Sequence, residues 1–146
     1  MKFPDKEPLF IYTHKLRTRY NETDQMGYVY HARYLEYFEA ARTEFVRSLG
    51  YTYKEMEDNG VMLPVIKAEL QFNTSIFYDD ELLVDIMFYE IPMVRLRTFY
   101  RVRTERGGDE PHVLGYVELV FLDAEKRKPT KAPAKFIERL KEKISG

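Results

Sequence analysis

The sequence of 146 residues contains no cysteine and no tryptophan. The lack of cysteine excludes disulfide bonds, a thiolate nucleophile and cysteine-based metal sites. The sequence also has no excess of either charge, because its 23 Lys and Arg residues nearly balance its 24 Asp and Glu residues. The chain therefore lacks the net positive field typical of nucleic-acid-binding proteins, and we expect no nucleic-acid partner.

Long hydrophobic runs are absent as well. No run approaches the ~18 apolar residues of a transmembrane helix, and residues 1–10, MKFPDKEPLF, lack the apolar segment of a secretory signal. We therefore expect a cytoplasmic protein without a membrane partner. The length and a hydrophobic content of 45% predict one domain over residues 1–146. Residues 1–10, with two prolines among charges, are expected to form a loose arm.

The longest predicted element lies within residues 19–50, RYNETDQMGYVYHARYLEYFEAARTEFVRSLG. Apolar residues at helical spacing predict one helix from about Tyr30 to Leu49 with one buried face, and Gly50 suits its end. That face comprises Tyr34, Leu35, Phe38, Ala41, Phe45, Val46 and Leu49. Arg42 interrupts it. Because an isolated buried charge is costly, we expect Arg42 to belong to a structural ion pair.

Alternation of apolar and polar residues predicts strands on both sides of this helix. They cover residues 12–20, 62–73, 82–90, 94–104 and 113–122, followed by a helix over 134–144. In the strand 94–104, arginines should lie on the outer face. The last strand is apolar on both faces, which indicates an interior strand or one covered by another subunit. This order predicts an α+β fold with a long central helix packed on a five- to six-stranded antiparallel sheet.

The segment Asp24-Gln25-Met26-Gly27 precedes the long helix. Asp24 has two interpretations. It is either a loop or capping residue or a catalytic carboxylate, since the predicted helix begins five or six residues later, far for an ordinary cap. Gly27 indicates a sharp turn or a close approach. A carboxylate near free N–H groups at a helix start, where His31 lies, is the arrangement that acyl-transfer chemistry needs.

One composite pattern resembles a known family. Arg19-Tyr20, Thr23 to Gly27, Val29-Tyr30-His31 and residues 34–42, YLEYFEAAR, are similar to the signature of the 4-hydroxybenzoyl-CoA thioesterase family of hotdog-fold proteins. The resemblance implies a hotdog fold and an acyl-CoA thioesterase without a cofactor. It implies that Asp24 is the catalytic nucleophile or general base and that the backbone N–H of His31 holds the oxyanion. The His31 side chain either contacts substrate or forms a structural hydrogen bond.

Substrate binding and assembly follow from the same resemblance. Substrate contacts are expected from Tyr20, Gly27, Tyr34, Lys67, Arg95 and Arg97, the cations serving the CoA phosphates. Hotdog proteins pair with the acyl pocket at the interface, so a homodimer or homotetramer is expected. No metal site is expected, because the three histidines fall in separate elements.

Two alternatives stay open at this point. The carrier is either CoA or an acyl-carrier protein, whose acidic surface would suit the basic strand 95–103. Alternatively, the chain is a hotdog protein that binds an acyl thioester without turnover. Acyl-chain length and aromatic or aliphatic preference cannot be read from one sequence.

Overall fold

An antiparallel sheet of five strands, in the order β1-β4-β5-β6-β3, carries the fold. The computed structural model describes all residues, 1–146. The strands are β1 (Phe10–Arg17), β3 (Val65–Phe72), β4 (Glu81–Phe88), β5 (Arg95–Thr104) and β6 (Val113–Val120). A small second sheet joins β2 (Val61–Met62), β7 (Leu122–Asp123) and β8 (Lys128–Pro129).

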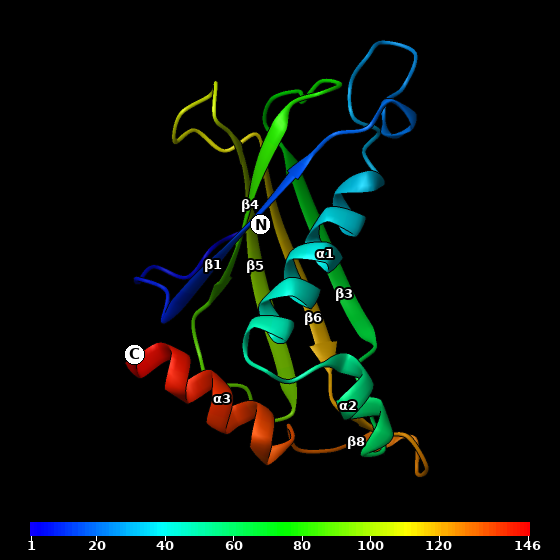
Figure 1. Ribbon diagram of the computed structural model, residues 1–146, viewed down its shortest axis with the longest axis vertical. Coiled ribbons are helices and arrows are strands. Elements are labelled where there is room, and N and C mark those ends of the chain that lie inside the picture. The colour runs from blue at the N-terminus through cyan, green and yellow to red at the C-terminus, as the bar shows by residue number, and fades with distance from the viewer.

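Three α-helices accompany the sheets: α1 (Arg33–Ser48), α2 (Tyr53–Asp58) and α3 (Ala134–Ser145). A short 3-10 turn, Tyr20–Glu22, follows β1. The long helix α1 lies across one face of the five-stranded sheet, while α2 and α3 lie together at one end of the molecule (Figure 1). The α+β class and the packing of a long helix on an antiparallel sheet are confirmed, with five strands in the main sheet.

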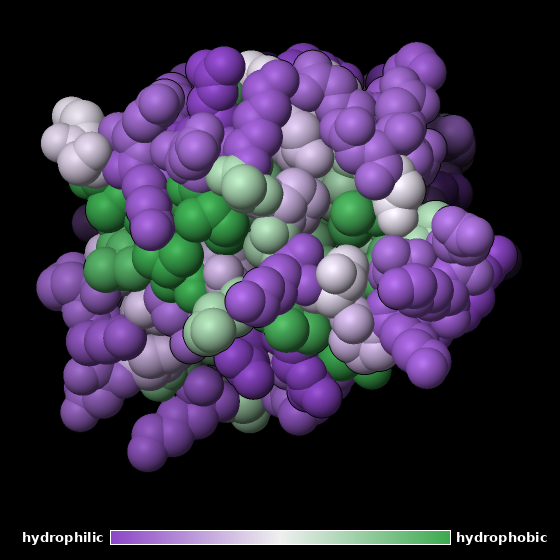
Figure 2. All heavy atoms as spheres, turned by 90° about the horizontal axis from the view of Figure 1, so that it is seen from below, coloured by the Kyte–Doolittle hydropathy of each residue, from purple (hydrophilic) through white to green (hydrophobic).

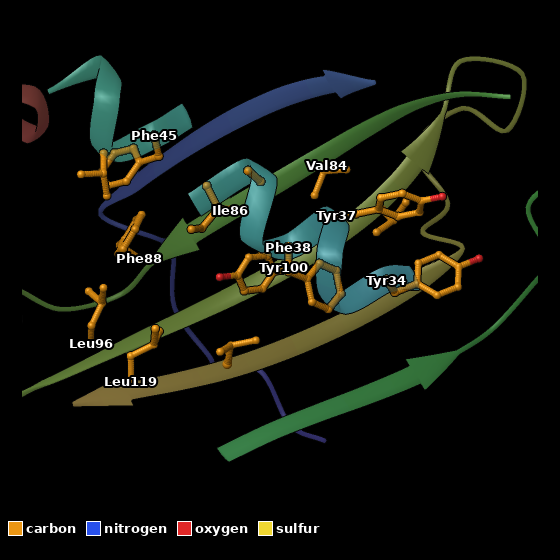
Figure 3. Close-up of a cluster of buried hydrophobic side chains, with 14 of the residues drawn as sticks. Tyr34, Tyr37, Phe38, Phe45, Val84, Ile86, Phe88, Leu96, Tyr100 and Leu119 are labelled. Carbon is orange, nitrogen blue, oxygen red and sulfur yellow. The ribbon is translucent and has the colours of Figure 1, made fainter. Parts of the chain in front are cut away.

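The core lies between α1 and the sheet, where α1 directs its aromatic side chains toward β4, β5 and β6 (Figure 3). Phe38 stacks on Tyr100 with ring centroids 4.3 Å apart, and Phe45 packs against Phe88 at 4.6 Å. Gly115 of β6 lies directly beneath Phe38, because a Cβ atom built there would come within 2.3 Å of the phenyl ring. The close approach of helix and sheet therefore depends on a residue without a side chain.

The boundaries of α1 differ from the prediction at its start. The helix begins at Arg33 rather than Tyr30, because the Tyr30 N–H donates to the Glu22 carbonyl and the Arg33 N–H donates to the Tyr30 carbonyl. Residues 31 and 32 form a turn instead. At the other end, Gly50 adopts a φ of 74°, as expected of a residue that ends a helix. Leu35 was wrongly assigned to the buried face, since it is 41% exposed.

The expected ion pair of Arg42 was also wrong. Arg42 is buried, with 6% of its surface exposed, but it forms no salt bridge. Its Nη1 donates instead to the Tyr100 hydroxyl at 2.9 Å. The Thr98 hydroxyl, 2.7 Å from the same phenolic oxygen, completes a polar group inside the core that contains no carboxylate. Helical spacing shows that Arg42 faces the sheet. It does not show that the partner on the sheet is the phenol of Tyr100 rather than a carboxylate.

The outer face of the sheet carries the arginines that the alternation of β5 predicts. Asp85 is fully buried among them and accepts hydrogen bonds at 2.8 Å from both Arg101 and Arg103. Burial by itself raises the pKa of Asp85, but the hydrogen bonds from Arg103, Thr13 and Arg101 outweigh it and hold the pKa below its usual value. This face is therefore held together by paired charges.

Residues 1–9 form no helix or strand, but they contact the sheet. The Phe3 ring lies 5.1 Å from that of Phe99 on the outer face. Seen from the end that carries α2 and α3, the surface is mostly hydrophilic, with apolar side chains exposed in patches between the charged ones (Figure 2). No helix is both long enough and apolar enough to cross a membrane.

Candidate active site

Asp24 lies in a tight turn that its own side chain organises. Its Oδ1 accepts the N–H groups of Met26 at 2.8 Å and Tyr28 at 3.2 Å. The main chain closes the same turn, because the Asp24 N–H donates to the Tyr28 carbonyl and the Gly27 N–H donates to the Asp24 carbonyl. Oδ2 makes no hydrogen bond within the chain. The turn thus fixes the carboxylate through one oxygen and leaves the other available.

Gly27 gives this turn its shape. Its φ of 81° lies in the left-handed region that favours glycine. The sharp turn expected at this position is confirmed. Beyond it, the Val29 N–H donates to the Ile76 carbonyl at 2.8 Å, which ties the segment to the connection between β3 and β4. The Asp24 turn is therefore anchored to the main sheet.

The start of α1 offers backbone donors. The N–H groups of His31 and Ala32 donate to no group of the chain, and the N-cap residue Ala32 supplies no side-chain cap. Such N–H groups carry the positive end of the helix dipole. The imidazole of His31 is exposed and makes no hydrogen bond; it lies 4.4 Å from the Tyr30 ring. This helix start can accordingly accept a negatively charged oxygen.

One cleft brings these groups together. It has a volume of about 280 Å³ and is lined by Asp24, Tyr28, Val29, His31 and Tyr34 on one side and by residues 72–76 on the other. Its lining residues lie just before and at the start of α1 and at and just after the end of β3. Figure 1 shows that α1 begins at the end of the sheet opposite α3. A volume at the lower end of the range for small-molecule sites suits a reactive centre rather than a whole ligand.

The wall formed by residues 72–76 is held by a buried histidine. His112, 6% exposed, has Nδ1 2.7 Å from the Thr74 hydroxyl and Nε2 2.9 Å from the Thr104 hydroxyl. Its carbonyl accepts the N–H groups of Asn73 and Thr74. Burial lowers the pKa of His112, and the nearby Arg106 lowers it further. A neutral imidazole therefore connects this wall of the cleft to β5.

Among the residues predicted to bind substrate, Tyr34 is buried in the wall of the cleft, and burial raises the pKa of its hydroxyl. Tyr20 is 77% exposed, packs edge-on against Tyr78 and does not line the cleft. Within one chain, then, Asp24, His31 and Tyr34 converge, and Tyr20 does not join them.

The three predicted cations lie elsewhere. Lys67 pairs with Glu69 at 3.1 Å on β3, Arg95 pairs with Glu118 at 2.7 Å, and Arg97 pairs with Glu90 at 2.7 Å. Arg95 and Arg97 stand opposite Val120 and Glu118 in the sheet, whereas the cleft adjoins the far end of β6, where Val113 pairs with Phe72. Their role in binding CoA stays a prediction, and it would require a ligand that extends well beyond the cleft.

Sequence reasoning missed the opposite wall, Phe72 to Ile76. Its polar members, Asn73, Thr74 and Ser75, follow directly after β3. A polar run at the end of an apolar strand is the signal that marks it. Its position beside Asp24, however, depends on the pairing of Tyr28 with Phe77, which no local pattern reveals.

Comparison with known proteins agrees with this geometry. YneP of Bacillus subtilis is 40% identical over 70 residues, which cover 48% of this chain and 51% of YneP. The acyl-CoA thioesterase YbgC of Haemophilus influenzae is 36% identical over 77 residues, covering 52% of this chain and 57% of YbgC. The chain thus matches little more than half the length of these two relatives.

A solved structure matches nearly the whole chain. The DHNA-CoA thioesterase from Staphylococcus aureus superposes with a TM-score of 0.82 at 28% sequence identity, covering 90% of this chain and 89% of that one. The family model described as the thioesterase-like superfamily matches residues 18–140, which include the Asp24 turn, α1 and every strand of the main sheet except β1. This chain belongs to the thioesterase-like superfamily.

Proposed function

We propose that this protein is a thioesterase that hydrolyses an acyl-CoA to a free acid and CoA. The observation that carries the proposal is a single cleft lined both by Asp24, an exposed residue, and by His31, which together with Ala32 has a backbone N–H without a partner in the chain. Membership of the thioesterase-like superfamily supports it. The names of two relatives, an acyl-CoA thioesterase and a DHNA-CoA thioesterase, indicate the same reaction class.

In the proposed reaction, the carboxylate of Asp24 acts on the thioester carbonyl. Its free Oδ2 either attacks the carbonyl carbon or removes a proton from an attacking water. When the C–S bond breaks, the general-base route gives the free acid directly, whereas the nucleophilic route leaves a mixed anhydride on Asp24 that a water molecule then hydrolyses to the free acid. In both routes CoA leaves as the thiolate and takes up a proton that comes from the water. General-base assistance of this kind typically contributes about 10²–10⁴ in rate. The turn that holds Oδ1 keeps the carboxylate in position for either role.

The oxyanion would be held at the start of α1. As the carbonyl carbon becomes tetrahedral, its oxygen gains negative charge, which the N–H of His31 and the helix dipole stabilise. One such donor is typically worth about 10²–10³ in rate. The exposed His31 side chain is not required for this role, because the donor belongs to the backbone.

The charges of β5 give no particular support to an acyl-carrier protein as the carrier. On the outer face, Arg95 pairs with Glu118 of β6 and Arg101 with Asp85 of β4, while Arg97 pairs with Glu90, just beyond the end of β4. This face therefore presents less uncompensated positive charge to an acidic protein partner than the sequence suggests. A cytoplasmic location and a single domain over 1–146 stay predictions.

We also propose that two copies pair through β3. It is an edge strand with a free edge, and Val65, Ile66 and Phe72 are each about half exposed. The other edge strand, β1, points Lys15 and Arg17 to solvent, which discourages pairing. Ile66→Lys should convert a dimer into a monomer in light scattering, and an unchanged mass would exclude this interface. The step from dimer to tetramer stays a prediction.

The activity can be tested with a thiol reagent. Because the chain contains no cysteine, the reagent reports only CoA released from substrate. We expect thiol release from at least one of butyryl-, benzoyl- and palmitoyl-CoA, with an equal amount of free acid. Release from the corresponding acyl-carrier proteins alone would identify the other carrier. Binding of these thioesters without release would overturn the proposal in favour of a non-catalytic binding protein.

A further inference from the structure

A second cavity lies between the middle of α1, α2 and β2, away from the start of α1 where the candidate active site lies. Its volume is about 180 Å³. Arg42 and Tyr53 provide its inner polar groups, and Met56, Leu63 and Leu119 are among its apolar walls. Along the helix, Arg42 is about 14 Å from Arg33, the first residue of α1, given a rise of about 1.5 Å per residue. The two sites are therefore separate within one chain.

The polar groups of this cavity are incompletely bonded. Arg42 makes one hydrogen bond, from Nη1 to Tyr100, and Nη2 makes none. Its Nε is buried and makes no well-formed hydrogen bond, and the same holds for the hydroxyl of Tyr53. The two side chains lie near each other: burial raises the pKa of this phenol, and the guanidinium partly offsets that rise. Buried polar atoms in folded proteins are nearly always bonded, and each exception needs an explanation. Here the unbonded donors belong to two residues that line the same cavity.

The charge of Arg42 is also uncompensated. Two carboxylates, Glu39 and Glu57, line the cavity, but both residues are exposed and neither forms a salt bridge with Arg42. Their repulsion of an anion is weakened by solvent and salt. The guanidinium, in contrast, is desolvated, and burying a charge without a partner is expensive. An anion bound beside it would remove that cost.

We propose that this cavity binds a small carboxylate with an apolar body. The planar guanidinium matches the two oxygens of a carboxylate. The Tyr53 hydroxyl supplies a further donor, and the side chains of Met56, Leu63 and Leu119 enclose the hydrocarbon part. Such a group could come from a free carboxylic acid or from the far end of a substrate acyl group. Only the second source rests on the proposed thioesterase activity.

Calorimetric titration with butyrate tests the site, with the neutral isostere butyramide as the ligand control. We expect butyramide to bind at least about tenfold more weakly, because it lacks the charge that Arg42 recognises. Tyr53→Phe should weaken butyrate binding about 3–10-fold through the loss of one hydrogen bond. Arg42→Met should abolish it, provided that circular dichroism shows a folded protein.

Tyr51→Phe is the matched control. The Tyr51 hydroxyl is likewise buried without a partner, but Tyr51 does not line the cavity. Its removal should therefore leave butyrate binding unchanged. Equal affinity for butyrate and butyramide, or a Tyr53→Phe protein that binds butyrate as the wild type does, would overturn the proposal even if Arg42→Met failed to fold.

Hydrolysis of dodecanedioyl-CoA and dodecanoyl-CoA, whose acyl chains are long enough to reach from the start of α1 to Arg42, distinguishes the two sources. If the carboxylate belongs to the substrate, Tyr53→Phe lowers kcat/KM for dodecanedioyl-CoA about 3–10-fold and leaves dodecanoyl-CoA unaffected. If it is a free acid, butyrate binds and both substrates respond alike. If neither thioester is hydrolysed, butyrate binding still tests this site, so failure of the proposed function is distinguished from failure of this inference.

Discussion

Two aspartate turns of this protein are built in a similar way, with one carboxylate oxygen accepting two backbone N–H groups, but they have different surroundings. At Asp24, Oδ1 accepts the N–H groups of Met26 at 2.8 Å and Tyr28 at 3.2 Å. At Asp123, Oδ1 accepts those of Glu125 at 3.0 Å and Lys126 at 2.8 Å. Each turn also contains a residue with positive φ, Gly27 or Arg127. As isolated motifs, the two differ only in detail, since the second N–H donor is four residues from Asp24 and three residues from Asp123.

Their neighbours distinguish them. The Asp24 turn lies beside the free N–H groups at the start of α1 and faces residues 72–76 across a cleft. The Asp123 turn belongs to the small β7–β8 hairpin. An aspartate turn is common ahead of helices and in loops. What makes Asp24 a candidate catalytic residue is the group of donors that the fold brings to it.

The largest expected difference between the turns is in catalysis. Asp24→Asn should lower kcat for acyl-CoA hydrolysis about 10²–10⁴-fold, because an amide keeps the acceptor Oδ1 but cannot act as a nucleophile or base. Asp123→Asn makes the same chemical change in the matching turn and should leave kcat unchanged. Parallel thiol-release assays measure both. Similar turnover by the two variants would show that Asp24, like Asp123, has only a structural role in its turn.

A second difference is the support behind the Asp24 turn. His112→Leu should lower the free energy of unfolding by about 1–3 kcal/mol, through the loss of buried hydrogen bonds to Thr74 and Thr104. Chemical denaturation measures this. His14→Leu is the control, because the His14 ring makes no hydrogen bond in the chain. This variant should lower the free energy of unfolding by less than His112→Leu does.

The same residue predicts a pH dependence. The pKa of His112 is lower in the folded state than its usual 6.5, so the folded protein favours the neutral ring. The neutral His112 ring therefore contributes its full stabilisation of the fold above about pH 6.5. This contribution is lost as the pH falls below 6.5 and through the lower pKa of the folded state. Thermal unfolding between pH 8 and pH 5 should show a smaller loss for His112→Leu than for the wild type. If the melting temperatures of both proteins fell equally with pH, a neutral imidazole bridging Thr74 and Thr104 would be contradicted.

Backbone strain separates the turns more finely. Gly27 has a φ of 81° and Arg127 a φ of 57°. Gly27→Ala should destabilise the fold by about 1–2 kcal/mol, whereas Arg127→Gly should stabilise it by up to about 1 kcal/mol. A Cβ atom at Gly27 would meet nothing within 4 Å, so the effect isolates conformation from packing. Urea denaturation of both variants gives the sign of the change in the free energy of unfolding. A stabilising effect of Gly27→Ala would contradict the positive φ at this position.

The smallest effect is expected at the His31 side chain. His31→Ala should lower kcat by less than about tenfold, because the imidazole makes no hydrogen bond and the backbone N–H is retained. A loss of kcat comparable to that of Asp24→Asn would indicate that the His31 imidazole, and not the backbone N–H, takes part in the reaction.

The sequence predicts much of this architecture because periodic patterns report burial. Phe38, Phe45 and Tyr100 lie on the predicted inner faces, and Arg101 and Arg103 on the predicted outer face. The patterns do not report contacts across the sheet. The ion pair expected of Arg42 is a hydrogen bond to a phenol.

The candidate site could be predicted only in part for the same reason. Asp24, Gly27 and His31 are close in sequence, so the segment that contains them stands out. The opposite wall, Asn73 to Ser75, reaches the cleft through long-range pairing and was missed. The position of His112 behind it depends on tertiary packing, which a strand pattern does not encode.

The most direct measurement is a backbone amide NMR titration with a butyryl-CoA analogue in which a methylene group replaces the thioester sulfur. The proposed site predicts that the amide resonances of His31 and Ala32 shift most, while those of Glu125 and Lys126 in the Asp123 turn stay in place. A bound analogue that leaves the His31 amide unmoved would contradict an oxyanion site at the start of α1.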